Sequence, residues 1–264
     1  MTLPAVTLVI TTYNWKEALL AVLHSVTQQN TMPSEVIVAD DGSGADTREM
    51  LLNLSKDFPV PLIHSWQDDC GFRAARSRNK AIASAAGDYI IIIDGDMILP
   101  PTFIEDHASN ATPNQFIQGG RVLLSNTLSQ EVIEDNRTIS FWTSGLKNRK
   151  NIINSRLLSR VFSRISNTDK STRSCNMSFW KSDIIAVNGF NNDFVGWGRE
   201  DSEFVVRLLN SGLNRLYLKF SGAGYHLYHN ENSRDALPEN DQILNDTIGK
   251  KLSYCKNGIS EFLN

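Results

Sequence analysis

Short apolar runs alternate with segments of helical periodicity along the first half of the chain. The predicted strands are 6–10, 35–39, 61–64 and 89–93, and the predicted helices are about 16–29, 46–54 and 73–86. The strands are apolar throughout, whereas apolar residues recur every three or four positions in the helices. This alternation favours right-handed crossovers and a parallel sheet with helices on both faces.

The second half of the chain has a weaker pattern. Residues 116–124 predict one further strand, and the stretch that follows is polar and basic. Within it, Arg156, Arg160 and Arg164 lie four positions apart among apolar residues and predict an amphipathic basic helix over 156–165. Such a helix either covers the surface of the domain or contacts an anionic membrane or an acceptor.

The composition is that of an ordinary globular protein, with 41% apolar and 21% charged residues among 264 and a net charge of −3. This length fits one large domain or two small ones. A charge near zero gives no reason to expect nucleic acid as a partner. The three cysteines are far apart and form no CxxC motif, which argues against disulfides and structural zinc. The first apolar run is too short for a signal peptide or a membrane span, so a cytoplasmic location is expected.

Polar clusters follow three of the predicted strands, at 11–14, 40–43 and 94–96. Because the carboxyl ends of parallel strands meet at one edge of a sheet, these clusters are expected to line one ligand site. The chain has neither GxGxxG nor GxxxxGK[ST], so no glycine-rich loop cradles a phosphate. A site rich in carboxylates holds a diphosphate only with a divalent cation, for which the DxD motif at 94–96 offers oxygen ligands.

Each of these features also has a purely structural interpretation. Aspartates are common in turns and helix caps, so neither the DxD motif nor the Asp40-Asp41 pair needs a ligand. The functional interpretation of the pair is recognition of a base or a ribose. Arg73, Arg76 and Arg78 are either solvated charges or include a counter-charge to a diphosphate.

Two further groups lie in the C-terminal part. Glycines flank Trp197, which favours an exposed loop, and Glu200 and Asp201 follow where a helix begins. These residues form either a helix cap or a sugar site, where the ring packs on the sugar and a carboxylate takes a proton from a hydroxyl. His226 and His229 are either structural or complete the shell of a Mn²⁺-like ion.

In these motifs the chain resembles family-2 glycosyltransferases with the GT-A fold, over nearly its whole length. Segments 9–14, 38–43, 73–82 and 87–96 follow the N-terminal pattern of that family in order. Residues 188–190 and 196–201 are similar to the C-terminal region shared by β-1,4-galactosyltransferases and chondroitin-polymerase-like enzymes. The resemblance implies an α/β GT-A fold, with a Rossmann-like, mostly parallel central sheet and a C-terminal acceptor-binding part.

The resemblance implies a role for each matching residue. Those that would bind the nucleotide sugar are Thr11, Tyr13, Asn14, Asp41, Arg73, Asp94, Gly95 and Trp197. Thr11, Tyr13 and Asp41 would contact the base, Arg73 the base or diphosphate, and Trp197 the donor or acceptor sugar. Asp94 would meet the ribose or the metal.

The same resemblance implies the metal ligands and the catalytic residues. Asp96 and His229 would hold Mn²⁺ or Mg²⁺, with His226 in the place of a second ligand. Asp201 would be the general base and Glu200 would bind the acceptor or the donor sugar. At position 199 the chain carries arginine where galactosyltransferases usually have glycine.

The implied function is inverting, metal-dependent transfer of a hexose or N-acetylhexosamine from a UDP-sugar to a hydroxyl of a glycan, giving a β-linkage. The implied acceptor is a lipid-linked intermediate of a surface polysaccharide such as O-antigen, with peripheral contact to the inner face of the plasma membrane. Residues 1–125 would bind the nucleotide sugar, and residues 126–264 the acceptor. The alternatives are a nucleotidyltransferase, which would want a basic glycine-rich loop after the first strand, and an inactive carbohydrate-binding scaffold.

Overall fold

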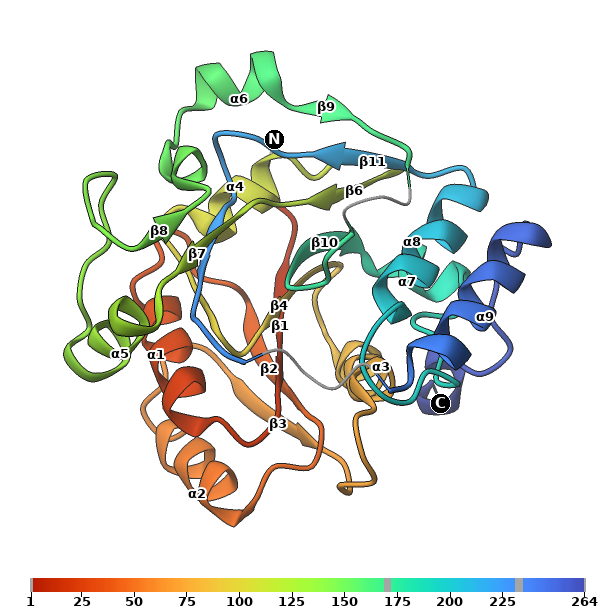
Figure 1. The fold of residues 1–264 in the computed structure, drawn as a ribbon, viewed down its shortest axis with the longest axis horizontal. Coiled ribbons are helices and arrows are strands. Elements are labelled where there is room, and N and C mark those ends of the chain that lie inside the picture. The colour runs from red at the N-terminus through yellow and green to blue at the C-terminus, as the bar shows by residue number, and fades with distance from the viewer. Residues whose placement is uncertain (1, 169–171, 231–234, 264) are drawn as a thin grey trace.

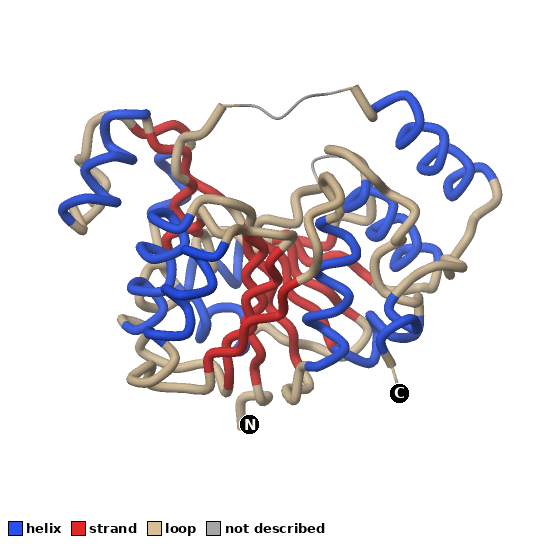
Figure 2. The backbone as a smooth tube through the Cα atoms, turned by 90° about the horizontal axis from the view of Figure 1, so that it is seen from below, coloured by secondary structure: helices blue, strands red, loops and turns tan. Residues whose placement is uncertain are grey.

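A mixed eight-stranded sheet runs through the centre of the protein in the order β3-β2-β1-β4-β10-β6-β11-β9 (Figure 1). The computed structural model describes residues 2–168, 172–230 and 235–263. Helices cover both faces of the central strands (Figure 2). The expected α/β fold with a mostly parallel central sheet is confirmed.

The first four strands form a parallel unit, as the alternating pattern predicted. The strands are β1 (Val6–Thr12), β2 (Glu35–Asp40), β3 (Leu62–Trp66) and β4 (Tyr89–Asp94), and the helices between them are α1 (Lys16–Thr27), α2 (Ala45–Leu54) and α3 (Ala74–Ser84). Strand β1 lies between β2 and β4, and pairs with both in parallel. The observed bounds differ from the predicted ones by one or two residues.

The C-terminal half supplies three of the other four strands of this sheet and two of the four strands of a second one. In the large sheet, β10 (Asn176–Trp180) runs antiparallel to β4 and is followed by β6 (Gln115–Gln118), β11 (Asn214–Tyr217) and β9 (Arg164–Ile165). The second sheet has the order β5 (Met97–Ile98), β12 (Gly224–His226), β7 (Arg121–Leu124) and β8 (Leu146–Lys147). Strands from both halves of the chain therefore share both sheets.

The single strand predicted over 116–124 is wrong. The segment divides at Gly119-Gly120, so that β6 belongs to the large sheet and β7 to the small one. A Cβ atom on Gly119 would lie 2.3 Å from the side-chain oxygen of Asn176, which packs against this turn. The glycine pair thus lets the chain pass from one sheet to the other beside β10.

The basic helix predicted over 156–165 is also wrong in its extent. Helix α6 (Arg156–Phe162) ends at an extended Ser163, and Arg164 lies in β9, which pairs with β11. Arg156 forms an ion pair with Glu105 of α4 (Phe103–Ser109). The three arginines therefore do not share one helical face.

Two apolar clusters fill the layers on either side of the large sheet. Alternate residues of β4 point to opposite layers, with Ile90 and Ile92 in one and Ile91 and Ile93 in the other. Helices α3, α7 (Lys181–Ala186) and α8 (Glu200–Asn210) cover the first layer, and α1, α2 and α4 the second.

The remaining helices lie outside these layers. Helix α5 (Asn126–Asp135) packs on the small sheet and α9 (Leu237–Gly249) packs on α8, and two short 3₁₀ helices span Arg149–Ile152 and Ile259–Phe262. No helix in the described part of the chain is long and apolar enough to cross a membrane.

A buried ion pair fixes α8 inside its layer. The Nε and Nη2 atoms of Arg207 donate to the two carboxylate oxygens of Glu203 at 2.8 Å, and the hydroxyl of Thr247 donates to Glu203 at 3.0 Å. Arg207 also donates to the carbonyl oxygen of Val187. Both charged side chains are fully buried, and each has its hydrogen-bonding groups engaged.

Removal of one partner would leave the other charge buried and unpaired. We expect Glu203→Ala to lower the free energy of unfolding by about 3–5 kcal/mol, measured by denaturant titration at pH 7. The matched control is Lys250→Ala, which breaks the exposed i,i+4 pair with Asp246 and should leave stability nearly unchanged. Equal losses in the two variants would contradict the argument from burial.

Candidate active site

The polar clusters after β1, β2 and β4 meet at one edge of the sheet. The backbone N–H of Gly95 donates to the carbonyl oxygen of Thr11 at 2.7 Å, and that of Asp41 donates to Thr12 at 3.0 Å. The N–H of Asn14 donates to the hydroxyl of Ser43 at 2.9 Å. The structure thus brings the three predicted clusters into direct contact, as the parallel arrangement requires.

Beside this edge, the DxD turn approaches two histidines from the end of β12. The Nε2 atoms of His229 and His226 lie 3.3 and 3.6 Å from Oδ2 of Asp96. The three ligand atoms all lie within 4.8 Å of one another. The backbone fixes this arrangement, because His226 pairs with Met97 and the N–H of Leu227 donates to the carbonyl oxygen of Asp96.

The hydrogen bonds of the two histidines define which ring nitrogen carries the proton. Nδ1 of His226 is 2.8 Å from the carbonyl oxygen of Leu227, and Nδ1 of His229 is 2.7 Å from that of Asn230. Because a carbonyl only accepts, both Nδ1 atoms are donors, and in the neutral form of each ring the lone pair of Nε2 faces Asp96. The Nε2 atoms and the carboxylate can therefore act as three converging ligands of a cation.

The electrostatics of this cluster agree with a cation site. Oδ1 of Asp96 is buried without a hydrogen-bond partner. Burial, with help from Asp94, raises the pKa of Asp96 well above its usual range, and the nearby Arg121 opposes this shift. Burial and the charge of Arg121 lower the pKa of His226 to about 4, so its imidazole is neutral at pH 7. Two imidazoles and a carboxylate fit a divalent ion such as Mn²⁺.

Arg78 connects this edge of the sheet to the C-terminal half. Its side chain is 3% exposed, and its Nε atom donates to the hydroxyl of Thr11 at 3.0 Å. Its two terminal nitrogens lie 3.2 Å from carboxylate oxygens of Asp94 and Glu200. One guanidinium from α3 thereby contacts β1, β4 and the start of α8.

The two carboxylates at the start of α8 have different surroundings. Glu200 pairs with Arg78, whereas Asp201 accepts hydrogen bonds from the backbone N–H groups of Ser202 at 2.6 Å and Ser174 at 3.3 Å. Burial, together with the charge of Glu200, raises the pKa of Asp201 to about 7, although Arg78 opposes this. A carboxylate with a pKa near neutrality is suited to accept a proton from a hydroxyl.

Trp197 lies on a tight loop that α9 holds in place. The side-chain amide of Asn240 donates to the carbonyl oxygens of Val195 and Gly198 at 3.3 and 3.0 Å. Arg199 ends the loop with a φ of 77°, a left-handed conformation that glycine adopts at no steric cost. The positive φ explains why glycine suits this position. In this chain the arginine at position 199 forms an ion pair with Asp241 of α9.

The other end of the edge carries the residues assigned to the nucleotide. Asp41 is buried, and its two oxygens accept from the side chain of Gln67 and the backbone N–H of Arg73, both at 2.6 Å. Tyr13 is 50% exposed and donates to Asp69 at 3.0 Å. Arg73, Gln67 and their neighbours line a cavity of about 390 Å³. The side-chain oxygen of Asn14 accepts a hydrogen bond from the backbone N–H of Gly44 at 3.0 Å. The role of each of these residues in nucleotide binding stays a prediction.

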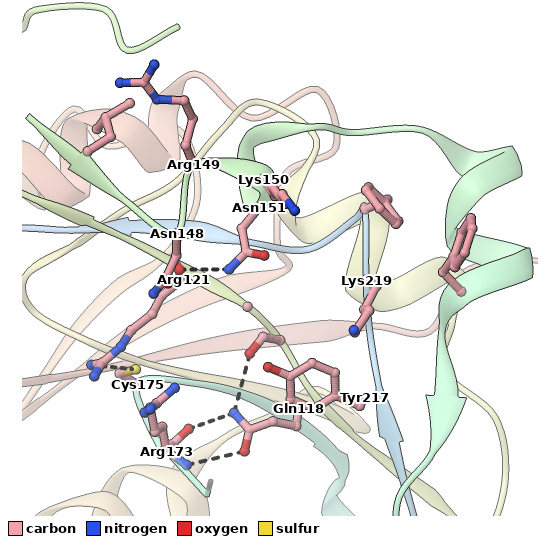
Figure 3. A pocket seen from close by; sticks show the side chains of 15 residues that line it. Gln118, Arg121, Asn148, Arg149, Lys150, Asn151, Arg173, Cys175, Tyr217 and Lys219 are labelled. Atoms are coloured by element: carbon pink, nitrogen blue, oxygen red, sulfur yellow. Dashed lines mark hydrogen bonds between the residues drawn. The ribbon is translucent and has the colours of Figure 1, made fainter. Parts of the chain in front are cut away.

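A larger cavity, of about 800 Å³, lies over β6 and β7 (Figure 3). Five basic side chains line it: Arg121, Arg149, Lys150, Arg173 and Lys219. The sequence did not predict this cavity, because these residues come from distant segments that share no local pattern. Only the basic character of part of the second half pointed towards it.

The family model described as Glycosyl transferase family 2 matches residues 7–162. The chain belongs to glycosyl transferase family 2. A second model, described as the N-terminal domain of galactosyltransferase, matches residues 158–230, which contain the Trp197 loop and both histidines. The resemblance drawn from the sequence motifs is therefore confirmed.

Characterised relatives of this family-2 chain are larger proteins. The chain is 26% identical over 251 residues to chondroitin synthase of Escherichia coli, covering 85% of this chain and 34% of that protein. It is 25% identical to a validoxylamine A glucosyltransferase of Streptomyces hygroscopicus subsp. limoneus, covering 80% and 49%. Against hyaluronan synthase of Pasteurella multocida the identity is 25%, covering 78% and 23%. The chain thus spans between about a quarter and a half of these relatives.

Two solved structures are similar in fold. A structure of GalNAc-T7 with UDP, GalNAc and Mn²⁺ aligns with a TM-score of 0.66 at 13% identity, over 92% of this chain and 48% of that one. The mannosyltransferase PcManGT from Pyrobaculum calidifontis, in complex with GDP-Man and Mn²⁺, aligns with a TM-score of 0.56 at 16% identity, over 86% and 57%. These likenesses show that the family-2 chain has the fold of glycosyltransferases.

The cation site can be tested on the protein without any sugar. We expect Mn²⁺ with UDP to raise the melting temperature and EDTA to remove the effect, since a ligand of the native state stabilises by about 2.7 kcal/mol at a hundredfold excess over Kd. His226→Ala and His229→Ala should each weaken the shift. His24→Ala, on the exposed side of α1, is the control and should not. A shift that survives both site substitutions would exclude these ligands.

Proposed function

We propose that this chain transfers a hexose or an N-acetylhexosamine from a UDP-sugar to a hydroxyl of a glycan acceptor, with inversion at the anomeric carbon. The observation that carries the proposal is the position of Asp201, a partly buried carboxylate with a raised pKa, which adjoins Glu200 and through it the Arg78 contact with the DxD edge. Membership of family 2 supports it and disfavours the nucleotidyltransferase alternative.

The donor side of the proposal rests on the polar edge of the sheet. Asp96, His226 and His229 would hold Mn²⁺ or Mg²⁺, which supplies positive charge to the leaving diphosphate when bound. Asp41, Tyr13 and Thr11 would contact the base, and Arg73 the base or the diphosphate, beside the cavity that Arg73 lines. The complexes of GalNAc-T7 and PcManGT, which contain nucleotides and Mn²⁺, support this assignment.

The acceptor hydroxyl would lose its proton to Asp201 as its oxygen attacks the anomeric carbon. Attack from the face opposite the diphosphate breaks the bond to the leaving oxygen in the same displacement, so an α-linked donor gives a β-linkage. Trp197 would pack its half-exposed ring on a sugar, and Glu200, held by Arg78, would orient a hydroxyl. One base suffices because no covalent intermediate forms.

The proposed acceptor is a lipid-linked intermediate of a surface polysaccharide such as O-antigen, and the proposed place of work is the inner face of the plasma membrane. Leu157, Val161 and Phe162 of α6 are exposed, and Arg160 and Arg164 beside them are exposed as well. Phe162 also lines the larger cavity, so this patch lies at its rim. An apolar patch with adjacent cations is suited to an anionic membrane surface.

The base assignment is tested by separating chemistry from binding. We expect Asp201→Asn to lower kcat by about 10²- to 10⁴-fold, because general base catalysis contributes that much, while the Kd of UDP with Mn²⁺ is unchanged. Activity is measured by UDP release across a panel of UDP-sugars and glycans. Equal loss of transfer and of UDP binding would contradict the role of Asp201.

The pH profile gives an independent check on the same residue. Asp201 must be ionised to act, so wild-type kcat/KM should fall as the pH drops through about 7. Glu200→Gln removes a negative charge that raises the pKa of Asp201, so the acid limb should move to lower pH. An acid limb that stays in place in Glu200→Gln would mean that another group controls it.

Membrane contact is tested by co-sedimentation with anionic vesicles. We expect the double variant Leu157→Ser and Val161→Ser to bind such vesicles less than wild type, because these side chains are 71% and 66% exposed on α6. The control is Leu52→Ser on α2, where the leucine is 63% exposed but is the only exposed large apolar side chain of its helix. Unchanged binding of the double variant would remove α6 from the proposal.

A further inference from the structure

Positive charge is concentrated in the lining of the larger cavity. Its basic lining residues are Arg121, Arg149, Lys150, Arg173 and Lys219, and no aspartate or glutamate lines it among the described residues. Within that part of the chain, no carboxylate lies at ion-pair distance from any of the five. The protein as a whole has a net charge of −3, so this concentration of cations is local.

Hydrogen bonds hold the backbone of Arg173 and the guanidinium groups of Arg149 and Arg121 in place. Gln118, which is buried, donates to the carbonyl oxygen of Arg173 at 2.9 Å and accepts from its N–H at 3.3 Å (Figure 3). Arg149 donates to the carbonyl oxygen of Thr143 at 2.9 Å. Arg121 approaches the sulfur of Cys175, with Nη1 and Sγ 3.7 Å apart. The cavity is therefore a built site with fixed donors, which lowers the entropic cost of binding an anion.

The cavity wall joins both parts of the candidate active site. Arg173 and Cys175 line the cavity, and the N–H of Ser174 between them donates to Asp201. On the other side, Arg121 pairs with Gly224 of β12, the strand that ends at His226. The wall of this cavity is thus connected both to the proposed base and to the strand that leads to the proposed cation site, which favours the cavity as part of the acceptor site.

We propose that the cavity binds an anionic group of the acceptor, so that the enzyme selects glycans with a carboxylate or phosphate close to the hydroxyl that reacts. This inference rests on the proposed function. Arg121 and Arg173 present guanidinium groups, which pair with the oxygens of such anions by parallel hydrogen bonds. Tyr217, Phe162 and Phe220 add aromatic surface to the wall, on which the apolar face of a sugar packs.

Two sources of the anion share this chemistry: a uronic acid residue of the glycan, and the phosphate of a lipid carrier. They are distinguished with two matched pairs of ligands in calorimetric titrations. One pair is a disaccharide that ends in a hexuronate and its neutral hexose counterpart. The other is an alkyl-diphosphate-linked hexose and the neutral alkyl hexoside.

For at least one pair, we expect wild-type protein to bind the anionic member at least tenfold more tightly than the neutral one. Arg173→Gln and Lys219→Gln should each reduce the preference, and Lys56→Gln, an exposed lysine on the distant segment after α2, should not. The preference should weaken at high salt, because the charges are accessible to solvent. The pair that shows it identifies the source.

Two outcomes would overturn the proposal. One is equal affinity for charged and neutral members in both pairs. The other is a loss of affinity for UDP with Mn²⁺ in Arg173→Gln and Lys219→Gln, which would assign the cations to the donor diphosphate. Because binding is measured without transfer, a failure of the proposed function would appear separately, as absence of UDP release with a binding preference still present.

Discussion

The buried guanidinium of Arg78 is the contact on which the geometry of the site depends. Four carboxylates, at Asp94, Asp96, Glu200 and Asp201, face a poorly solvated region where like charges repel strongly. An arginine keeps its charge at any physiological pH, and this one pairs with Asp94 and Glu200 at once. Arg78 therefore links Glu200, at the start of α8, to the ends of β1 and β4.

A second cation, Arg121, acts on the candidate cation site. Its charge opposes the rise in the pKa of Asp96 and lowers that of His226. Both effects favour the ionisation states in which Asp96 and His226 donate electron pairs. Two arginines from different elements thus act on the candidate site: Arg78 contacts the sheet edge, and Arg121 lines the larger cavity.

Much of the fold and part of the site could be predicted from local patterns. The alternation of apolar runs and helical segments fixes a parallel sheet, and a parallel sheet places the residues after its strands at one edge. That reasoning grouped residues 11–14, 40–43 and 94–96 correctly. The approach of His226 and His229 to Asp96 was expected only from the family pattern, since they come from strands with no sequence proximity.

The features that could not be predicted depend on tertiary contacts. Residues 116–124 are apolar enough for one strand, but Asn176 packs against Gly119 and divides them. Arg164 keeps helical spacing with Arg160, yet pairing with β11 takes it into a strand. Arg78 lies on the same short basic segment as Arg73 and Arg76. Its contacts with Thr11, Asp94 and Glu200 arise only in the tertiary structure, so the sequence did not single it out.

Each of the two sheets contains strands from both halves of the chain, which has a consequence for the engineering of such enzymes. β10 lies between β4 and β6, and β12 lies between β5 and β7, so segments from each half complete the sheets of the other. In a chimera that joins the first half of one relative to the second half of another, strands from different proteins would therefore have to pair with each other inside both sheets. New acceptor preferences are better sought by exchanging the side chains that line the cavity, on a backbone that is kept whole.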